Sequence, residues 1–116
     1  MANVHAFFGG LPVAQAAAWT QTYFVENDVA AVNAARNKPP VYIAETGWPT
    51  ESMTAANATY QAAVSGIPQL QNFLDTFVCQ ANTNGTKYFY FETFDEPASP
   101  LLFPPSLQVA DDTSVE

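Results

Sequence analysis

The sequence is almost devoid of cysteine and histidine: Cys79 and His5 are the only ones among its 116 residues. A single cysteine excludes an internal disulfide, and one cysteine with one histidine falls short of the ligand set of a zinc site. A Cys–His nucleophile pair would also lack a third residue to orient it. We therefore expect no metal, and we interpret Cys79 as a buried, unreactive thiol.

Basic residues are also scarce. Three Lys and Arg residues stand against 11 Asp and Glu residues, which gives a formal net charge of −8. A surface of this charge repels nucleic acid and anionic membranes, so neither is an expected partner, whereas a neutral polysaccharide is compatible with it. Long apolar runs are missing as well. No run approaches the ~20 residues of a membrane span, and the N-terminus lacks the pattern of a signal peptide.

Apolar residues make up 48% of the sequence and aromatic residues 14%, which favours a packed core over disorder. Three short apolar runs are expected to be strands. The two segments between them have helical character, because apolar residues in the second recur every three or four positions. Alternating strands and helices predict an α/β fold with a parallel sheet and right-handed crossovers. The expected strands are 3–8, 41–44 and 88–94, and the expected helices cover 13–35 and about 68–81.

Two segments lie outside this alternation. Residues 51–66 are polar and rich in small residues, and they follow an expected strand. We interpret them as a loop over the carboxyl end of the sheet, with room for a short helical turn. Beyond Phe94 the sequence has four prolines and an acidic end, so the chain from residue 98 to residue 116 is expected to be an irregular tail.

The most informative stretch is VYIAETGWPT, residues 41–50. An apolar run ends in the carboxylate of Glu45, and Trp48 follows three residues later. Active sites of α/β barrels are built at such strand ends, and sugar chemistry uses carboxylates beside aromatic surfaces. We therefore interpret Glu45 as the nucleophile of a glycoside hydrolase and Trp48 as a sugar-stacking surface. The alternatives are that Glu45 caps a helix or pairs with Lys38 or Lys87, and that Trp48 is an apolar anchor.

Further candidates flank the outer strands. Glu92, Asp95 and Glu96 crowd the end of the third strand, where they could recognise sugar hydroxyls or form a buried hydrogen-bond network. In the first strand, His5 would share a face with Phe7 by alternation. His5 is a candidate for the substrate cleft or a satisfied structural histidine, and Phe8 at the strand end could line the same cleft.

The segments NVHAFF, AETGWPT, FVCQA, NGT and YFYFETFDEP, in this order, resemble the carboxyl-terminal part of glycoside hydrolase family 17. The fungal cell-wall β-1,3-glucanases and glucanosyltransferases are the most similar members. The resemblance implies a partial (β/α)₈ TIM barrel, in which the three strands correspond to strands 6–8. Residues 1–97 would form this barrel fragment and residues 98–116 a separate tail. It also implies an extracellular or cell-wall location and β-1,3-glucan as the partner.

The same resemblance implies a retaining mechanism with Glu45 as nucleophile, and no metal or organic cofactor. The family's acid/base lies on a fourth strand with no counterpart here, and Ala98 and Ser99 replace the aromatic or amide residue and the lysine that usually follow DEP. The isolated chain is therefore expected to be inactive. The implied substrate-binding residues are His5, Phe8, Trp48, Glu92, Asp95 and Glu96. A non-catalytic glucan-binding or assembly fragment, self-associating through exposed sheet edges, is the alternative. A truncated product without a role of its own is a third reading.

Overall fold

The structure, a computed structural model, describes residues 1–52, 54 and 56–92. Its centre is a three-stranded parallel sheet in the order β1-β2-β5. Each strand follows the previous one in the sheet after a helical connection, as the alternation of the sequence predicts. The α/β class and the parallel pairing are thus confirmed for the described residues. The strands are β1 (Ala2–Asn3), β2 (Ile43–Thr46) and β5 (Tyr88–Tyr90).

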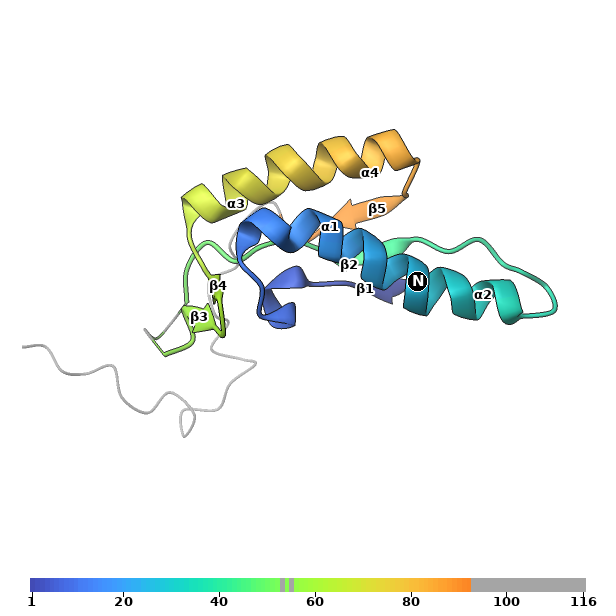
Figure 1. The fold of residues 1–116 in the computed structure, drawn as a ribbon, viewed down its shortest axis with the longest axis horizontal. Helices are drawn as coiled ribbons and strands as arrows, with labels where there is room; N and C mark the ends of the chain where they lie inside the picture. The colour runs from blue at the N-terminus through green and yellow to red at the C-terminus, as the bar shows by residue number, and fades with distance from the viewer. Residues whose placement is uncertain (53, 55, 93–116) are drawn as a thin grey trace, which may run out of the picture.

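Two long helical segments connect the strands, and both cover the same face of the sheet (Figure 1). Right-handed crossovers that advance one strand at a time require this arrangement. Pro68 lies in the first turn of the second segment, where its missing N–H costs nothing. Gly85 ends that segment in the left-handed conformation with φ 67°. The first segment comprises α1 (Val13–Tyr23), η2 (Phe24–Val29) and α2 (Ala30–Ala34), and the second α3 (Ile67–Phe73), η3 (Leu74–Val78) and α4 (Cys79–Asn84).

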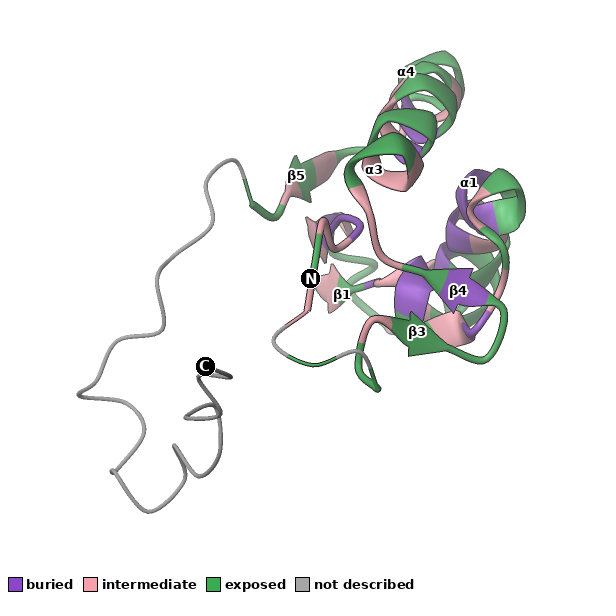
Figure 2. Ribbon diagram, turned by 90° about the vertical axis from the view of Figure 1, so that its left-hand side faces the viewer, coloured by how far each residue is buried: buried purple, intermediate pink, exposed green. Residues whose placement is uncertain are grey.

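The core lies between the sheet and the helices, where buried residues cluster (Figure 2). Phe73 and Phe77 are almost fully buried, and their rings stack with centroids 5.0 Å apart. Trp48 packs against Phe73 from the segment that follows β2. The aromatic residues of the second helical stripe therefore supply the largest side chains of the core.

The first strand is shorter than predicted. It ends at Asn3, and a 3-10 helix, η1 (Ala6–Gly9), replaces the second half of the expected strand. Gly10 closes this turn with φ 73°, a conformation that glycine adopts without strain. The predicted alternation of His5 with Phe7 is therefore wrong. The turn buries Phe7 and leaves Phe8 70% exposed.

The segment 51–66 contains a small antiparallel hairpin that was not predicted, and before it a single turn in which the N–H groups of Asn57 and Ala58 donate to the carbonyl of Thr54. The strands of the hairpin are β3 (Thr59–Tyr60) and β4 (Ala63–Val64). The backbone N–H of Ala62 donates to the carbonyl of Gly10 at 3.0 Å, and Ala63 is fully buried. The hairpin is thus held by contacts with η1 that a local sequence pattern does not contain.

Cys79 is exposed on the second helical segment, so the prediction of a buried thiol is wrong. It follows Val78, which is only half-buried, and the buried stripe passes through Phe77 and Ala81 instead. The predicted domain boundary at residue 97, the irregular tail, Asp95 and Glu96 all lie outside the described residues.

Candidate active site

A bulge in β2 determines where Glu45 points. Ile43 pairs with Tyr88 and Thr46 pairs with Tyr90, so β2 has one more residue than β5 over this interval. Tyr88 packs against the helical layer, and the fully buried Thr46 lies on the same side. The extra residue lets the neighbouring Glu45 lie on the side away from the helices, where its side chain is 39% exposed.

Glu45 has a specific partner. His5 Nε2 lies 3.4 Å from Glu45 Oε2, an ion pair when the imidazole is protonated and a long hydrogen bond otherwise. β1 and β2 bring the two residues together, because Asn3 pairs with Glu45 and the chain then turns into η1. Within the described part of the chain, Glu45 pairs with His5 and not with Lys38 or Lys87.

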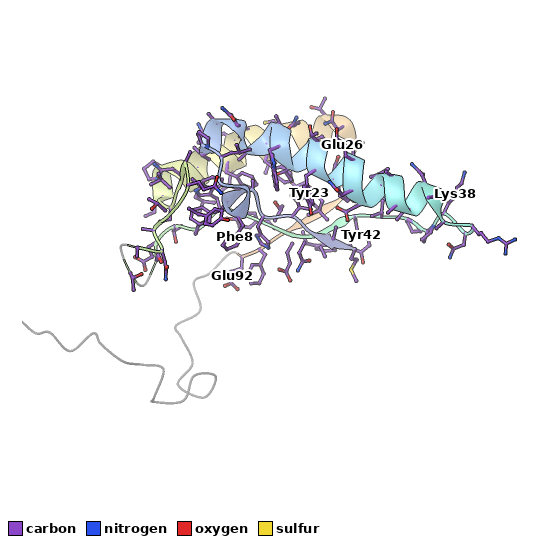
Figure 3. The ribbon with its side chains drawn as sticks, turned by 60° about the horizontal axis from the view of Figure 1, so that its bottom comes forward. Phe8, Tyr23, Glu26, Lys38, Tyr42 and Glu92 are labelled. Atoms are coloured by element: carbon purple, nitrogen blue, oxygen red, sulfur yellow. The ribbon has the colours of Figure 1, made fainter. Side chains whose placement is uncertain are left out.

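A cavity of about 520 Å³ opens beside this pair. Its size falls within the range of about 300–1,000 Å³ that small-molecule sites occupy. Phe8 lines it from η1 and Glu92 from the segment that follows β5, and Figure 3 shows both below the helices. The cavity residues are His5, Phe7, Phe8, Gly47, Trp48, Pro49, Thr50, Glu51, Ser52, Asn57, Leu70, Tyr90, Phe91 and Glu92.

Trp48 forms the floor of the cavity rather than an open platform. Its side chain is only 4% exposed, its ring meets Phe7 edge to face at 5.5 Å, and its Nε1 donates to the carbonyl of Val64 at 2.9 Å. Burial with a satisfied N–H is the arrangement expected of an anchor. This geometry favours the alternative interpretation of Trp48 over sugar stacking.

Gly47 allows a close approach between two strands at the site. A Cβ at this position would overlap the carbonyl oxygen of Phe91, whose N–H donates to Thr46 at 2.8 Å. The absence of a side chain therefore lets β2 and the end of β5 converge beside Glu45. This explains why glycine follows the Glu-Thr pair of the motif.

The structure brings four of the predicted substrate-binding residues to the cavity, namely His5, Phe8, Trp48 and Glu92, whereas Asp95 and Glu96 lie outside the described residues. Glu92 is exposed at the cavity, so it needs no buried hydrogen-bond partner. Sequence reasoning did not find Phe91, Glu51 or Asn57, which also line the cavity. The position of Glu51 and Asn57 after β2 was the available signal, because loops at the carboxyl end of a parallel strand face the site.

Within residues 1–52, 54 and 56–92, no group of three or more His, Cys, Asp and Glu side chains is placed to hold a metal ion. No helix in the same residues has the length and apolar character needed to cross a membrane.

Known proteins resemble the chain over most of its length. Residues 1–101 match the BtgE/BtgC glycoside hydrolase domain family. A probable glucan endo-1,3-beta-glucosidase btgC of Aspergillus fumigatus is 45% identical over 104 residues, and the btgC glucan endo-1,3-beta-glucosidase of Emericella nidulans is 42% identical over 103. Each match covers 84% of this chain but only 15–16% of the relative, so the chain spans a small part of their length.

Two solved structures share the fold. The glycoside hydrolase family 17 β-1,3-glucanosyltransferase of Rhizomucor miehei matches with a TM-score of 0.65 and 25% identity. An active-site mutant of the Rhizomucor enzyme, in complex with laminaritriose, matches with the same TM-score and 24% identity. Both matches cover 82% of this chain and 32% of the other.

Proposed function

The chain belongs to the BtgE/BtgC glycoside hydrolase domain family, and from this premise we propose that it carries the nucleophile side of a β-1,3-glucan-active site of the glycoside hydrolase family 17 type. Residues 1–97 correspond in this proposal to strands 6–8 of a (β/α)₈ barrel, and residues 98–116 to a separate tail. The family-17 neighbours support the barrel assignment. The names of the relatives support β-1,3-glucan as the polymer. A location outside the cell or in the cell wall is part of the proposal and rests on the resemblance in sequence.

One observation carries the proposal. Glu45 lies near the carboxyl end of the central strand and pairs with His5. His5 lines the aromatic cavity, whereas Glu45 lies behind His5 and is not itself one of the lining residues. The carboxyl ends of parallel strands are where α/β barrels place their reactive groups. We infer that a glucan bound in the cavity extends past His5 to the half-exposed carboxylate of Glu45.

The chemistry follows from a carboxylate in this position. In a retaining glycosidase the ionised carboxylate attacks the anomeric carbon while a second carboxyl group, about 5–5.5 Å away, protonates the departing oxygen. Water or an acceptor sugar then releases the glycosyl unit. Glu45 takes the first role. We assign the second role to no residue of this chain, so the isolated chain binds glucan but turns it over little or not at all. The reaction requires neither a metal nor an organic cofactor.

The test compares the chain with its Glu45→Gln variant on laminarin, with reducing ends as the readout. Any turnover should disappear in the variant, while binding of laminaritriose is retained because the amide has the same shape. Measurable turnover that is equal in the two proteins, or the absence of laminaritriose binding to both, would defeat the assignment of Glu45.

The alternative function, a non-catalytic fragment that assembles with a second copy of the chain, has its own observation. β1 lies at the edge of the sheet, and a second cavity of about 330 Å³ lies beside it, lined in part by the stacked rings of Trp19 and Tyr23. At the other edge, Phe89 and Phe91 are 64% and 51% exposed. Uncovered edges and aromatic surface favour association. Sedimentation should show dimers or larger species at about tens of micromolar, and a stable monomer would remove this alternative.

A further inference from the structure

Two exposed aromatic rings stand beside the cavity. Phe8 of η1 is 70% exposed and Tyr60 of β3 is 45% exposed. Their ring centroids are 6.4 Å apart with an interplanar angle of 68°, so the rings form a corner rather than a flat stack. Phe8 lines the cavity, whereas Tyr60 lies beyond Phe8 on the hairpin. The corner therefore continues the aromatic surface outward from the cavity wall.

Phe8 is held in position despite its exposure. Its ring makes edge contacts with His5 at 6.3 Å and with Phe7 at 5.5 Å, in addition to Tyr60. The backbone beneath it is fixed because the N–H of Gly10 donates to the carbonyl of Phe7 at 3.0 Å. An aromatic ring that is fixed at its edge but open to solvent is suited to stacking on a ligand.

The hairpin that carries Tyr60 is tied to the site at several points. Trp48 Nε1 donates to the carbonyl of Val64, and the N–H of Gly66 donates to the carbonyl of Pro49 at 3.0 Å. The donor Trp48 and the acceptor Pro49 both belong to the segment that follows Glu45. These hydrogen bonds hold the hairpin that carries Tyr60 against the loop that forms the cavity floor.

We propose that the Phe8–Tyr60 corner is a further sugar-binding subsite that receives the glucosyl unit next to those in the cavity, and that it selects for the β-1,3 linkage. The inference rests on the proposed function, because it takes a glucan chain in the cavity as given. Phe8 supplies one stacking face, and Tyr60 supplies a second face and a hydroxyl that can donate to or accept from a sugar hydroxyl.

The geometry of the corner gives the selectivity. A β-1,4-glucan is a flat ribbon and can lie against one ring at a time, whereas β-1,3 linkages turn the chain. A turning chain can contact two rings set at 68°. Loss of Tyr60 should therefore weaken the binding of β-1,3-oligosaccharides more than that of β-1,4-oligosaccharides.

Calorimetric titration of the whole chain with laminari-oligosaccharides of two to five units tests the subsite, with cello-oligosaccharides as the linkage control. We expect Tyr60→Ala to remove the gain in affinity that accompanies the unit reaching the corner, a loss of about three- to tenfold for the longer ligands. The shortest ligands should be unaffected. Tyr60→Phe should keep the stacking part of that gain. Phe89→Ala is the matched control, because Phe89 is another exposed aromatic residue with one ring partner and it lines neither cavity.

The outcomes separate the two proposals. If the chain binds laminari-oligosaccharides but Tyr60→Ala binds every length within about twofold of the unsubstituted chain, the subsite is refuted and the proposed function stands. An equal loss for laminari- and cello-oligosaccharides would refute the linkage selectivity. If the unsubstituted chain binds no laminari-oligosaccharide, the proposed function fails and the subsite fails with it.

Discussion

Replacing Trp48 with phenylalanine separates its two interpretations, as an anchor and as a sugar platform. The change keeps an aromatic ring but removes the indole N–H that donates to the carbonyl of Val64 at 2.9 Å. It also removes about two buried carbon atoms, since the side chain is 4% exposed. The variant therefore probes the link between the core and the β3–β4 hairpin.

The expected loss of stability follows from the groups that Trp48→Phe removes. Two carbon-sized groups at about 0.8 kcal/mol each contribute roughly 1.6 kcal/mol, and the lost hydrogen bond contributes about 1 kcal/mol. Trp48→Phe should therefore lower the free energy of unfolding by about 2–3 kcal/mol. Its affinity for laminaritriose at a temperature where it is folded should stay within about threefold of the unsubstituted chain.

Urea unfolding followed by circular dichroism, together with laminaritriose titration of the same samples, measures both quantities. Trp19 is the only other tryptophan, so its fluorescence provides a second probe of unfolding in the variant. A stability change below about 0.5 kcal/mol combined with a tenfold or greater loss of binding would refute the anchor and restore the platform.

Four further substitutions test the packing. Gly47→Ala should lower the free energy of unfolding by about 1–3 kcal/mol and weaken glucan binding, because the new Cβ overlaps the Phe91 carbonyl. Gly85→Ala is the control, since no atom lies within 4 Å of its Cβ. It should lower the free energy of unfolding by only about 1 kcal/mol and leave binding unchanged. Equal effects in urea unfolding would contradict this. Phe73→Ala, in the fully buried stack, should cost about 3–5 kcal/mol, and a loss below about 1 kcal/mol would show the stack is loose. Thr20→Val should stabilise the chain by up to about 1 kcal/mol, since the buried hydroxyl has no hydrogen-bond partner among the described residues. A lower melting temperature of the variant would contradict this.

The parallel sheet and its two helical crossovers could be predicted because their signals are local. The run that ends at Glu45 is apolar and short, and the stripe containing Phe73 and Phe77 repeats at helical spacing. In the structure the second helical segment runs to Asn84 and ends at Gly85, slightly beyond the end expected near residue 81. These features depend on the residues of one element and not on their partners.

Other features depend on contacts between distant segments and could not be predicted. The bulge that turns Glu45 away from the helices arises from the pairing of β2 with β5. The β3–β4 hairpin has strands of two residues, and it is held by Trp48 and by the carbonyl of Gly10. The exposure of Phe8 follows from the tight turn before Gly10, where strand alternation had suggested an extended chain.

The most direct test of the account is whether a β-1,3-glucan reaches the residues beside Glu45. His5 is the only histidine, so its imidazole carbon–proton signal can be assigned without ambiguity in a nuclear magnetic resonance spectrum. Because His5 lines the cavity and contacts Glu45, laminaritriose should shift this signal saturably, and the α-linked maltotriose should not. A His5 signal that stays in place while laminaritriose saturates other signals, or that moves equally with maltotriose, would contradict a glucan site at Glu45.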